Sequence, residues 1–569
     1  MYLSKNWRST VSARWFQPLL LLIWLIIGIS LRLANLTAKP PWIDEFATLV
    51  FSLGNSFLPV PLDQAIAPDI LLQPLQINPT AGIGDVIHLM VTQDTHPPLY
   101  FVMAHLWMKL FPHPFGLVSL WAGRSLPALL GAASIPGAYL LGKLAFRSAL
   151  VGQLSAAMMA VSPYGIFLAQ EARHYSLAVI WVMASLTCLV IAIRHLQNRT
   201  LLPLWLIIAW VGVNALGIAT HYFFVLTLGA EALVLIFVAW QQYTHTKTLL
   251  FLSSLWWRIY FIAAGTAVAA VVWLPSFLQN RYRSSLTEWI QGERVGLDWI
   301  NPIFQALAAW ITMISLLPVE APQLTVVIAS GLVMLIFFIW ATPILVRGLK
   351  VQLQQPETRL ITQVLAGVVL GAIALFFFFT YFLGIDLTRG ARYNFVYFPA
   401  VIILLGASLA VCYQNRDIGK WRITGKQAVI LIWLMGLISA ITVTSNLGYR
   451  KYYRPDLLVS LIEQNSQLPV LIATTHKSLV QTGEMMGIAW ELKFSGSQAN
   501  TQFLLAHQDQ DPNTSTTSLD NTLKELPRPF DLWLVNFHAP IAEEVQKCDA
   551  ENKNLPAING YVYELYHCQ

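Results

Sequence analysis

Two adjacent acidic residues, Asp44 and Glu45, have the chemistry and the setting to move a proton. They open a run in which apolar residues recur at positions 42, 43, 46, 49, 50, 53 and 57, within roughly a 120° stripe of a helix. A carboxylate there can act as a general base toward a hydroxyl nucleophile. The alternative is that both acids only satisfy a helix N-terminus, where negative charge is favoured by about 0.3–1 kcal/mol.

Basic and aromatic side chains gather at the predicted outer ends of several apolar segments. Guanidinium groups bind phosphate bidentately and stay charged, so such a group of residues suits a phosphate-bearing ligand. A single Arg at this depth is also explained by a long side chain that reaches the interface, but that does not explain acids and cations together. The residues are Arg32, Arg124, Arg173, Tyr175, His221, Arg389, Arg392 and Tyr393, and the acid Glu171 lies in the same turn as Arg173.

These residues belong to a chain whose composition fits a lipid environment. Of its 569 residues, 56% are hydrophobic and only 11% are charged, against about 25% charged in soluble proteins. This excludes a disordered chain, a coiled coil and an ordinary cytosolic enzyme, and the net charge of +6 gives no reason to expect nucleic acid. Segments long enough to cross roughly 30 Å of hydrocarbon lie near 15–36, 118–142, 149–169, 176–194, 201–220, 222–240, 259–279, 323–346, 360–384, 395–413 and 427–447.

The basic residues predict how these spans are oriented. With the N-terminus inside, the cytoplasmic segments hold sixteen basic residues and two acidic ones, as the positive-inside rule requires. Two shorter apolar stretches, 97–112 and 302–318, would move basic loops outside if they crossed, so we expect them not to cross. We therefore expect an all-α multi-pass protein of the plasma (inner) membrane, with about 11–13 transmembrane helices if the short stretches are counted.

The chain is expected to form two domains. Residues 1–448 make a transmembrane module whose first outer loop, 37–96, carries amphipathic helices on the membrane surface, the second of them at Ile83–Val91. Residues 449–569 hold fourteen acidic and nine basic residues and form a small extracytoplasmic α/β domain. Its predicted loop is Asp509–Asp520, and its predicted β-type runs are Pro469–Thr474, Gln502–Ala506, Asp531–Phe537 and Tyr561–Tyr566.

Two further features are interpreted as structural. Cys548 and Cys568 lie in the predicted extracytoplasmic domain, where disulfides persist, and a bond between them would fix the C-terminus. Glu231 lies in the middle of a span, where an ionisable group costs about 2.5–3.5 kcal/mol. We therefore expect Glu231 to face protein and to accept a hydrogen bond.

The order of these motifs resembles the GT-C superfamily of polyprenyl-phosphate-sugar-dependent glycosyltransferases. More narrowly, it is similar to the protein mannosyltransferase and Rgt-like group of glycosyltransferase family 39, with the lipid A aminoarabinose transferase more distant. The resemblance covers roughly residues 15–240. It rests on Asp44-Glu45, His-Pro-Pro-Leu-Tyr at 96–100, Arg-x-x-Pro at 124–127, Ala-Gln-Glu-Ala-Arg-x-Tyr at 169–175 and, later in the chain, Arg392-Tyr393 before Pro399.

This resemblance implies inverting transfer of a sugar from a polyprenyl phosphate, held with membrane lipid, to an acceptor hydroxyl on the extracytoplasmic face. Asp44 is then the general base, and Glu45 positions the acceptor or shares that task. An Arg would neutralise the departing phosphate. The first candidate for it is Arg173, the second is Arg392 and the third is Arg124. The acceptor is a protein, lipid or polysaccharide, and neither a metal nor another cofactor is required. The rest of the implied donor site is His96, Tyr175, Glu171, His221 and Tyr393.

Two other functions compete with sugar transfer. A transporter or flippase usually shows internal repeats and polar groups near the middle of the membrane, whereas this chain has no evident repeat and gathers its polar groups at one face. A polymerase or ligase of lipid-linked saccharides would place its cationic loop late in the chain. In the aminoarabinose branch the second outer turn offers an Asp where this chain offers Glu171 and Arg173, which leaves the role of Glu171 open.

Overall fold

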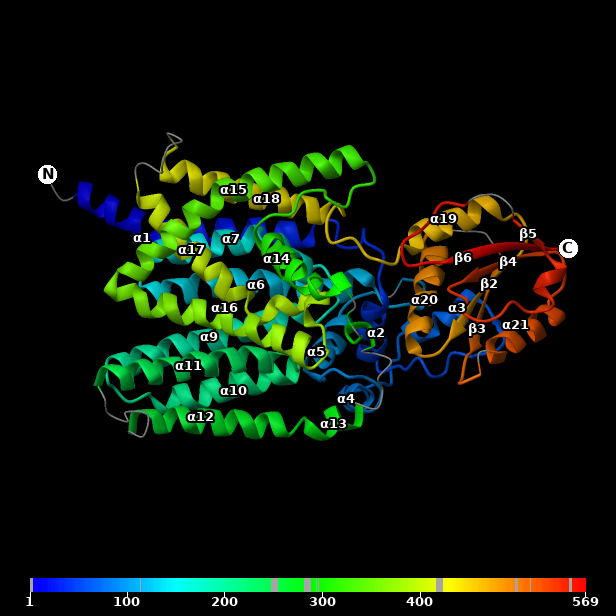
Figure 1. Ribbon diagram of the computed structural model, residues 1–569, viewed down its shortest axis with the longest axis horizontal. Coiled ribbons are helices and arrows are strands. Elements are labelled where there is room, and N and C mark those ends of the chain that lie inside the picture. Colours follow the sequence, from blue (N-terminus) through cyan, green and yellow to red (C-terminus); the bar gives the residue numbers. More distant parts are fainter. Residues whose placement is uncertain are drawn as a thin grey trace. The chain divides into compact units, whose positions relative to one another are not determined.

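The structure is a computed structural model that describes residues 4–112, 114–246, 254–280, 288–292, 294, 296–415, 423–496, 500–511, 513–551 and 555–569. Its backbone contacts divide the chain into two compact units (Figure 1). The first unit is helical, and the second contains a β-sheet. The first comprises Met1–Leu36, Val91–Tyr100 and Arg124–Tyr449, and the second Thr37–Met90, Phe101–Gly123 and Arg450–Gln569.

Long apolar helices make up most of the first unit. Among the described residues, seven helices are long and apolar enough to cross a membrane, and a bent pair makes an eighth if it is one span. The bent pair is α7 (Ala149–Val161) and α8 (Pro163–Ala169), with 58° between them. The seven are α1 (Ser4–Leu33), α6 (Leu120–Phe146), α9 (Tyr175–Gln197), α11 (Phe224–Thr246), α15 (Leu324–Gln354), α16 (Pro356–Phe382) and α18 (Gly425–Thr444).

Every predicted span coincides with one of these helices or with a shorter apolar helix. The shorter ones are α10 (Leu204–Thr220), α12 (Ser254–Val271), which α13 (Leu274–Asn280) follows, and α17 (Phe398–Gln414). The stretches expected not to cross contain α5 (Leu99–Met108) and α14 (Asn301–Ile314). At 1.5 Å per residue these two helices are about 15 and 21 Å long, less than the roughly 30 Å of hydrocarbon.

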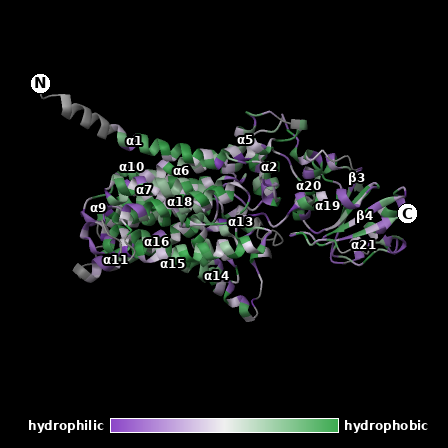
Figure 2. Ribbon diagram, turned by 90° about the horizontal axis from the view of Figure 1, so that it is seen from above, coloured by the Kyte–Doolittle hydropathy of each residue, from purple (hydrophilic) through white to green (hydrophobic). Residues whose placement is uncertain are grey.

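Hydrophobic residues predominate along the helices of the first unit (Figure 2), and many of their large apolar side chains are exposed. On α15, Leu332, Leu335 and Ile339 are each more than half exposed. Such a surface is stable against lipid but not against water. The chain is therefore a multi-pass helical membrane protein with a small C-terminal α/β domain, as the sequence predicted.

Glu231 on α11 is buried inside the first unit and accepts a hydrogen bond, which confirms its prediction as a structural acid. The Ser185 hydroxyl on α9 donates to Glu231 Oε2 at 2.9 Å. Trp210 on α10 donates its indole N–H to the Ser185 oxygen at 3.0 Å. The acid thus joins three neighbouring helices in a place where an unsatisfied carboxyl group would be costly.

Arg32 stabilises the break between α7 and α8. Pro163 has no N–H, so the carbonyl of Met159 loses its helical donor. The fully buried Arg32 of α1 donates Nη2 to that carbonyl at 2.9 Å and Nη1 to the carbonyl of Ala160 at 3.2 Å. The sequence grouped Arg32 with phosphate-binding cations; the structure instead assigns its donors to backbone carbonyls.

The second unit is built on a six-stranded sheet of order β1-β3-β2-β4-β6-β5. The three parallel strands in its centre, β2 (Val470–His476), β3 (Thr501–His507) and β4 (Phe530–Val535), match three of the predicted β-type runs. The fourth run is β6 (Tyr563–Cys568), antiparallel to β4. The helices that its C-terminal segment contributes are α19 (Pro455–Asn465), α20 (Leu479–Phe494) and α21 (Asn513–Glu525), and the strand beside β6 at the edge of the sheet is β5 (Asp549–Ala550).

The first outer loop contributes to this sheet. Its strand β1 (Ala65–Ile66) pairs antiparallel with β3, placing Ala65 opposite Leu504. Asp69 of the same loop forms an ion pair with Lys493 of α20, with 2.5 Å between Oδ1 and Nζ. Residues 37–90 therefore belong with the C-terminal domain, whereas the sequence assigned them to the transmembrane module. The pairing uses backbone groups of segments over 400 residues apart, and the side-chain pattern carries no signal for it.

The segment predicted as the loop Asp509–Asp520 contains most of helix α21. Asp511 Oδ1 accepts the N–H of Asn513 at 2.9 Å, and Leu519 and Leu523 enter the core of the second unit. The Ser, Thr and Asn residues of this segment favour turns in isolation, and tertiary burial of two leucines overrides that preference.

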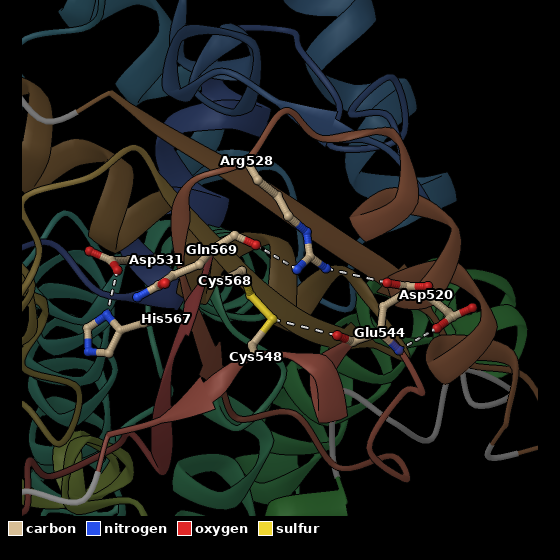
Figure 3. The surroundings of a disulfide bond; sticks show 8 residues. All are labelled: Asp520, Arg528, Asp531, Glu544, Cys548, His567, Cys568 and Gln569. Atoms are coloured by element: carbon tan, nitrogen blue, oxygen red, sulfur yellow. Dashed lines mark hydrogen bonds and ion pairs between the residues drawn. A yellow bond between two sulfur atoms is a disulfide. The ribbon is translucent and has the colours of Figure 1, made fainter.

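The C-terminus is tied to the sheet by several interactions (Figure 3). Cys548 and Cys568 form the disulfide that the sequence left open. Arg528 donates to the carbonyl of the last residue, Gln569, at 3.0 Å. His567 of β6 faces Asp531 of the neighbouring strand β4, with 2.7 Å between Nδ1 and Oδ1.

Replacing Arg32 by Met is predicted to destabilise the first unit. Two buried carbonyl oxygens lose their donors, at about 1–3 kcal/mol each, so we expect a loss on the order of 2–6 kcal/mol. Thermal unfolding of the purified protein in lipid nanodiscs measures it. Arg347→Met, at an exposed position on α15, is the control, and equal melting of the two variants would contradict the structural role of Arg32.

Candidate active site

A short turn between α8 and α9 buries several polar side chains of the first unit. Residues 170–174 connect the two helices, and the N–H of Arg173 donates to the carbonyl of Glu171 at 2.6 Å. Glu171, Arg173 and His174 are all at least 96% buried. The turn is too short to extend into solvent, so its charged side chains lie inside the protein.

Arg173 is the end of a chain of three hydrogen-bonded side chains. Its Nη2 lies 3.2 Å from His96 Nε2, and His96 Nδ1 lies 2.6 Å from Asp94 Oδ1. A guanidinium can only donate, so His96 Nε2 accepts and the ring proton stays on Nδ1, where Asp94 accepts it. Asp94 thus orients His96, and His96 orients Arg173.

Two more imidazoles complete a cluster formed by His96, His174 and His221. The His174 ring centroid lies 5.0 Å from that of His96 and 4.6 Å from that of His221. His221 occupies the turn between α10 and α11, and its Nδ1 accepts the backbone N–H of Phe223 at 3.0 Å. We call these three residues the histidine cluster.

Aromatic rings and a second Arg border the histidine cluster. The Tyr175 ring lies 5.9 Å from the Arg173 guanidinium carbon and 4.5 Å from the His174 ring. The Tyr393 ring lies 6.3 Å from that of His221. Arg392 stacks its guanidinium over the rings of Tyr393 and Trp289, at 5.4 and 5.0 Å. The rings confine both cations and keep water away from them.

Burial and neighbouring charges set the protonation states. Burial opposes ionisation of Asp94, but the His96 ring and the charge of Arg173 outweigh it, so the pKa of Asp94 lies below its ordinary value. Burial lowers the pKa of His174 and of His221 well below the usual range, and neighbouring imidazoles and Arg173 lower both further. At neutral pH, Asp94 is ionised and the rings of His174 and His221 are neutral.

The spacing of the three imidazoles would also suit a metal ion, since one ring nitrogen of each lies within 4.8 Å of the others. A metal ligand must offer an unprotonated nitrogen. His96 Nε2 already accepts from Arg173, and His221 Nδ1 accepts from Phe223. With a guanidinium beside them, these rings favour an anion over a divalent cation.

The structure brings many of the predicted site residues together in the first unit. His96, Arg173, Tyr175, His221 and Tyr393 contact one another directly or through one neighbour, and Arg392 lies on Tyr393. Besides Arg32, two predicted residues are held differently, Arg124 and Arg389.

Arg124 is buried and donates Nη1 to the carbonyl of Leu36 at 2.9 Å, at the end of the first span. Arg389 is exposed and donates Nη1 to the carbonyl of Trp289 at 2.7 Å.

The acidic pair lies in the second unit, on α2 (Ile43–Ser52). Glu45 is fully buried, and Asp44 is half-buried. The apolar stripe of α2 packs on α20, where the Phe46 and Trp490 rings are 6.1 Å apart. Gly483 of α20 permits this approach, because a Cβ there would lie 3.1 Å from Ile43 Cγ2. The sequence predicted that this stripe would lie on the membrane surface, and the structure places it against protein instead.

The sequence analysis missed three residues of this site. Asp94 precedes His96 by two residues, a spacing typical of a side chain that caps its own turn, and this could have indicated it. His174 stands between two residues that the analysis did select. Trp289 gave no signal, because only the tertiary structure brings it to Arg392.

The fold and the site define a multi-pass membrane protein with buried guanidinium and imidazole groups at the ends of its helices. No protein-family model matches the sequence, and no curated protein matches it.

Solved structures with a similar fold include two enzymes. One is ArnT from Cupriavidus metallidurans bound to undecaprenyl phosphate, with 12% identity, 92% of this chain and 97% of that chain covered, and a TM-score of 0.45. The other is the Archaeoglobus fulgidus oligosaccharyltransferase in the apo form. Its identity is 12%, the match covers 91% of this chain and 69% of that chain, and the TM-score is 0.44. The similarity concerns the fold and assigns no residue or substrate.

Stability is predicted to fall as the pH drops below about 6.5, the ordinary pKa of histidine. The unfolded chain then binds protons at His174 and His221 that the folded chain excludes, so unfolding becomes more favourable by up to about 1.4 kcal/mol per pH unit for each ring. In His221→Asn, whose amide oxygen can replace Nδ1 as acceptor, the melting temperature should depend less on pH. Melting curves of the variant and the wild type between about pH 5 and 8 measure this dependence. The difference between their melting temperatures at about pH 8 is the control. An unchanged slope would contradict the buried, neutral state of His221.

Proposed function

We propose that the chain is an integral membrane glycosyltransferase that moves a sugar from a polyprenyl-phosphate donor to an acceptor hydroxyl. The observation that carries this proposal is the buried Arg173, held by Asp94 and His96 beside two neutral imidazoles. A desolvated cation with fixed orientation is suited to a phosphate group whose negative charge grows as it leaves.

The first unit contains the residues proposed to bind the donor. Arg173 neutralises the phosphate, and Arg392, braced by Trp289 and Tyr393, is the second cation. His221 accepts the N–H of Phe223 at Nδ1, so its neutral ring carries a proton on Nε2 and donates there to a phosphate oxygen. His96, Tyr175 and Tyr393 line the donor pocket, and the lipid chain of the donor lies among the apolar helices.

Asp44 and Glu45 are the residues proposed to act on the acceptor. Asp44 is half-buried and can meet a hydroxyl from solvent, whereas Glu45 is fully buried and positions the acceptor. The acceptor oxygen attacks the anomeric carbon, and Asp44 takes its proton. The bond from that carbon to the phosphate oxygen breaks, the electron pair stays on the phosphate, and the configuration inverts. The acceptor class, whether protein, lipid or polysaccharide, is an outcome of the assay.

Two substitutions test the proposed base and the proposed phosphate-binding cation. Asp44→Asn removes the base and should lower the rate of transfer by about 10²–10⁴-fold. Arg173→Gln removes the phosphate cation and should cost about 10²–10³-fold. The measurement is transfer by purified protein from a panel of polyprenyl-phosphate monosaccharides to a cell-envelope extract.

Asp85→Asn is the matched control. Asp85 also lies in the first turn of a helix of the same loop, α4 (Ile83–Gln93), where it accepts the N–H of Gly82. It should retain full activity. Wild-type activity in Asp44→Asn would disprove the assignment of the base, and movement of intact lipid-linked sugar without transfer would indicate a flippase.

The proposed face of catalysis predicts a labelling pattern. Leu58→Cys in the first outer loop should react with an impermeant maleimide in intact cells, whereas Lys350→Cys should react only after permeabilisation, because positive charge marks the cytoplasmic side. Both positions are exposed. Background is low, since Cys188 and Cys412 are buried and Cys548 and Cys568 are bonded. The reverse pattern would contradict the proposed orientation, because it would place the N-terminus outside and the C-terminal domain in the cytoplasm.

A further inference from the structure

The sheet of the second unit has a topological switch point between β2 and β4. From β2 the chain crosses through α20 to β3 on one side, and then returns through α21 to β4 on the other side of β2. In open sheets with parallel strands, ligands bind in the crevice outside the carboxyl ends of the strands at such a point. The first residues after the two strands are Lys477 and Asn536.

A cleft of about 530 Å³ lies at this crevice. Thr475 and Lys477 border it from the end of β2, and Asn536 and His538 from the end of β4. The volume falls within the range of small-molecule sites. The cleft is formed entirely by residues of the second unit, so it is separate from the histidine cluster.

A buried carboxyl group and an amide are held in fixed positions in the wall of the cleft. Glu484 is 7% exposed and accepts from the Tyr453 hydroxyl at 2.7 Å. Asn536 donates to the carbonyl of Gly560 at 3.1 Å and accepts the N–H of Val562 at 2.9 Å. Burial raises the pKa of Glu484 above its usual value. These polar groups are oriented before any ligand arrives.

Tyrosine rings form the other part of the wall. Tyr452 and Tyr453 meet edge to face at 5.4 Å, and Tyr453 and Tyr561 at 5.7 Å. Tyr452 is 70% exposed. A pyranose offers an apolar C–H face to an aromatic ring and hydroxyl groups to carboxyl and amide side chains, which matches this wall.

The start of α20 argues against a phosphate or nucleotide ligand. Phosphate sites at helix N-termini need free backbone N–H groups, commonly in a glycine-rich loop. Here Gln481 Oε1 accepts the N–H of Ser478 at 2.8 Å and of Lys477 at 3.2 Å, and Ser478 Oγ accepts that of Val480. The capping side chains thus occupy the N–H groups that a phosphate would use.

We propose that the cleft at the carboxyl ends of β2 and β4 is a binding site for a saccharide. The aromatic wall contacts the sugar ring, and the groups around Glu484, Asn536 and Lys477 bind its hydroxyls. The proposal does not depend on the transfer chemistry, since it concerns a different site on a different unit. It gives the C-terminal domain a ligand of its own.

Saturation-transfer NMR on the full-length chain tests the proposal. The protein is placed in lipid nanodiscs, because alkyl maltoside detergents themselves carry a saccharide. The probes are methyl α-mannoside, methyl β-galactoside, methyl β-glucoside and chitobiose, with no lipid-linked donor present. At least one probe should receive saturation, and Tyr452→Ala and Lys477→Ala should each reduce it about fivefold or more, because the sugar loses a ring contact in the first variant and a hydrogen bond to a charged donor in the second.

Lys524→Ala is the matched control, because Lys524 is also an exposed lysine of this unit but lies on α21, outside the cleft. It should bind as the wild type does. The proposal is overturned if no probe receives saturation, if the signal persists in both cleft variants, or if uridine monophosphate displaces the sugar. An inactive transferase that still binds sugar would contradict only the proposed function.

Discussion

The hydrogen-bonded chain from Asp94 through His96 to Arg173 is the interaction on which the rest of the candidate donor site depends. It keeps a desolvated guanidinium charged and aimed in one direction. That charge, together with burial, holds His174 and His221 neutral. Without Asp94 the cluster would combine a cation with three rings and no compensating negative charge, an arrangement that burial strongly disfavours.

The second buried cation, Arg32, is explained by the hydrogen bonds that it donates to backbone carbonyl groups. Arg32 donates to the carbonyl of Met159, which Pro163 leaves without a donor, and to the carbonyl of Ala160, so the first helix is fixed to the bent pair of helices at its break. In the second unit, strand β1 of the first outer loop likewise completes hydrogen bonds at the edge of the C-terminal sheet. In both cases an unsatisfied backbone group decides which distant segments meet.

Much of the site was predictable because side-chain chemistry is local. Arg173, His221 and Tyr393 were chosen for their type and their position at helix ends, and His96 was implied by the family resemblance. The structure brings all four together. Arg32 and Arg124 have the same type and position but bind backbone carbonyls. Residue type predicts that a guanidinium needs acceptors; it does not say whether a ligand or the protein supplies them.

The sequence by itself determined the membrane class, the position of each apolar helix, the four main strands and the acidic pair at the start of α2. These follow from hydrophobic periodicity and span length, which are properties of contiguous residues. The tertiary structure decided that the first outer loop joins the C-terminal sheet, that α2 packs on α20, and that Trp289 braces Arg392. Each of these depends on which distant surfaces fit together, and no local pattern carries that information.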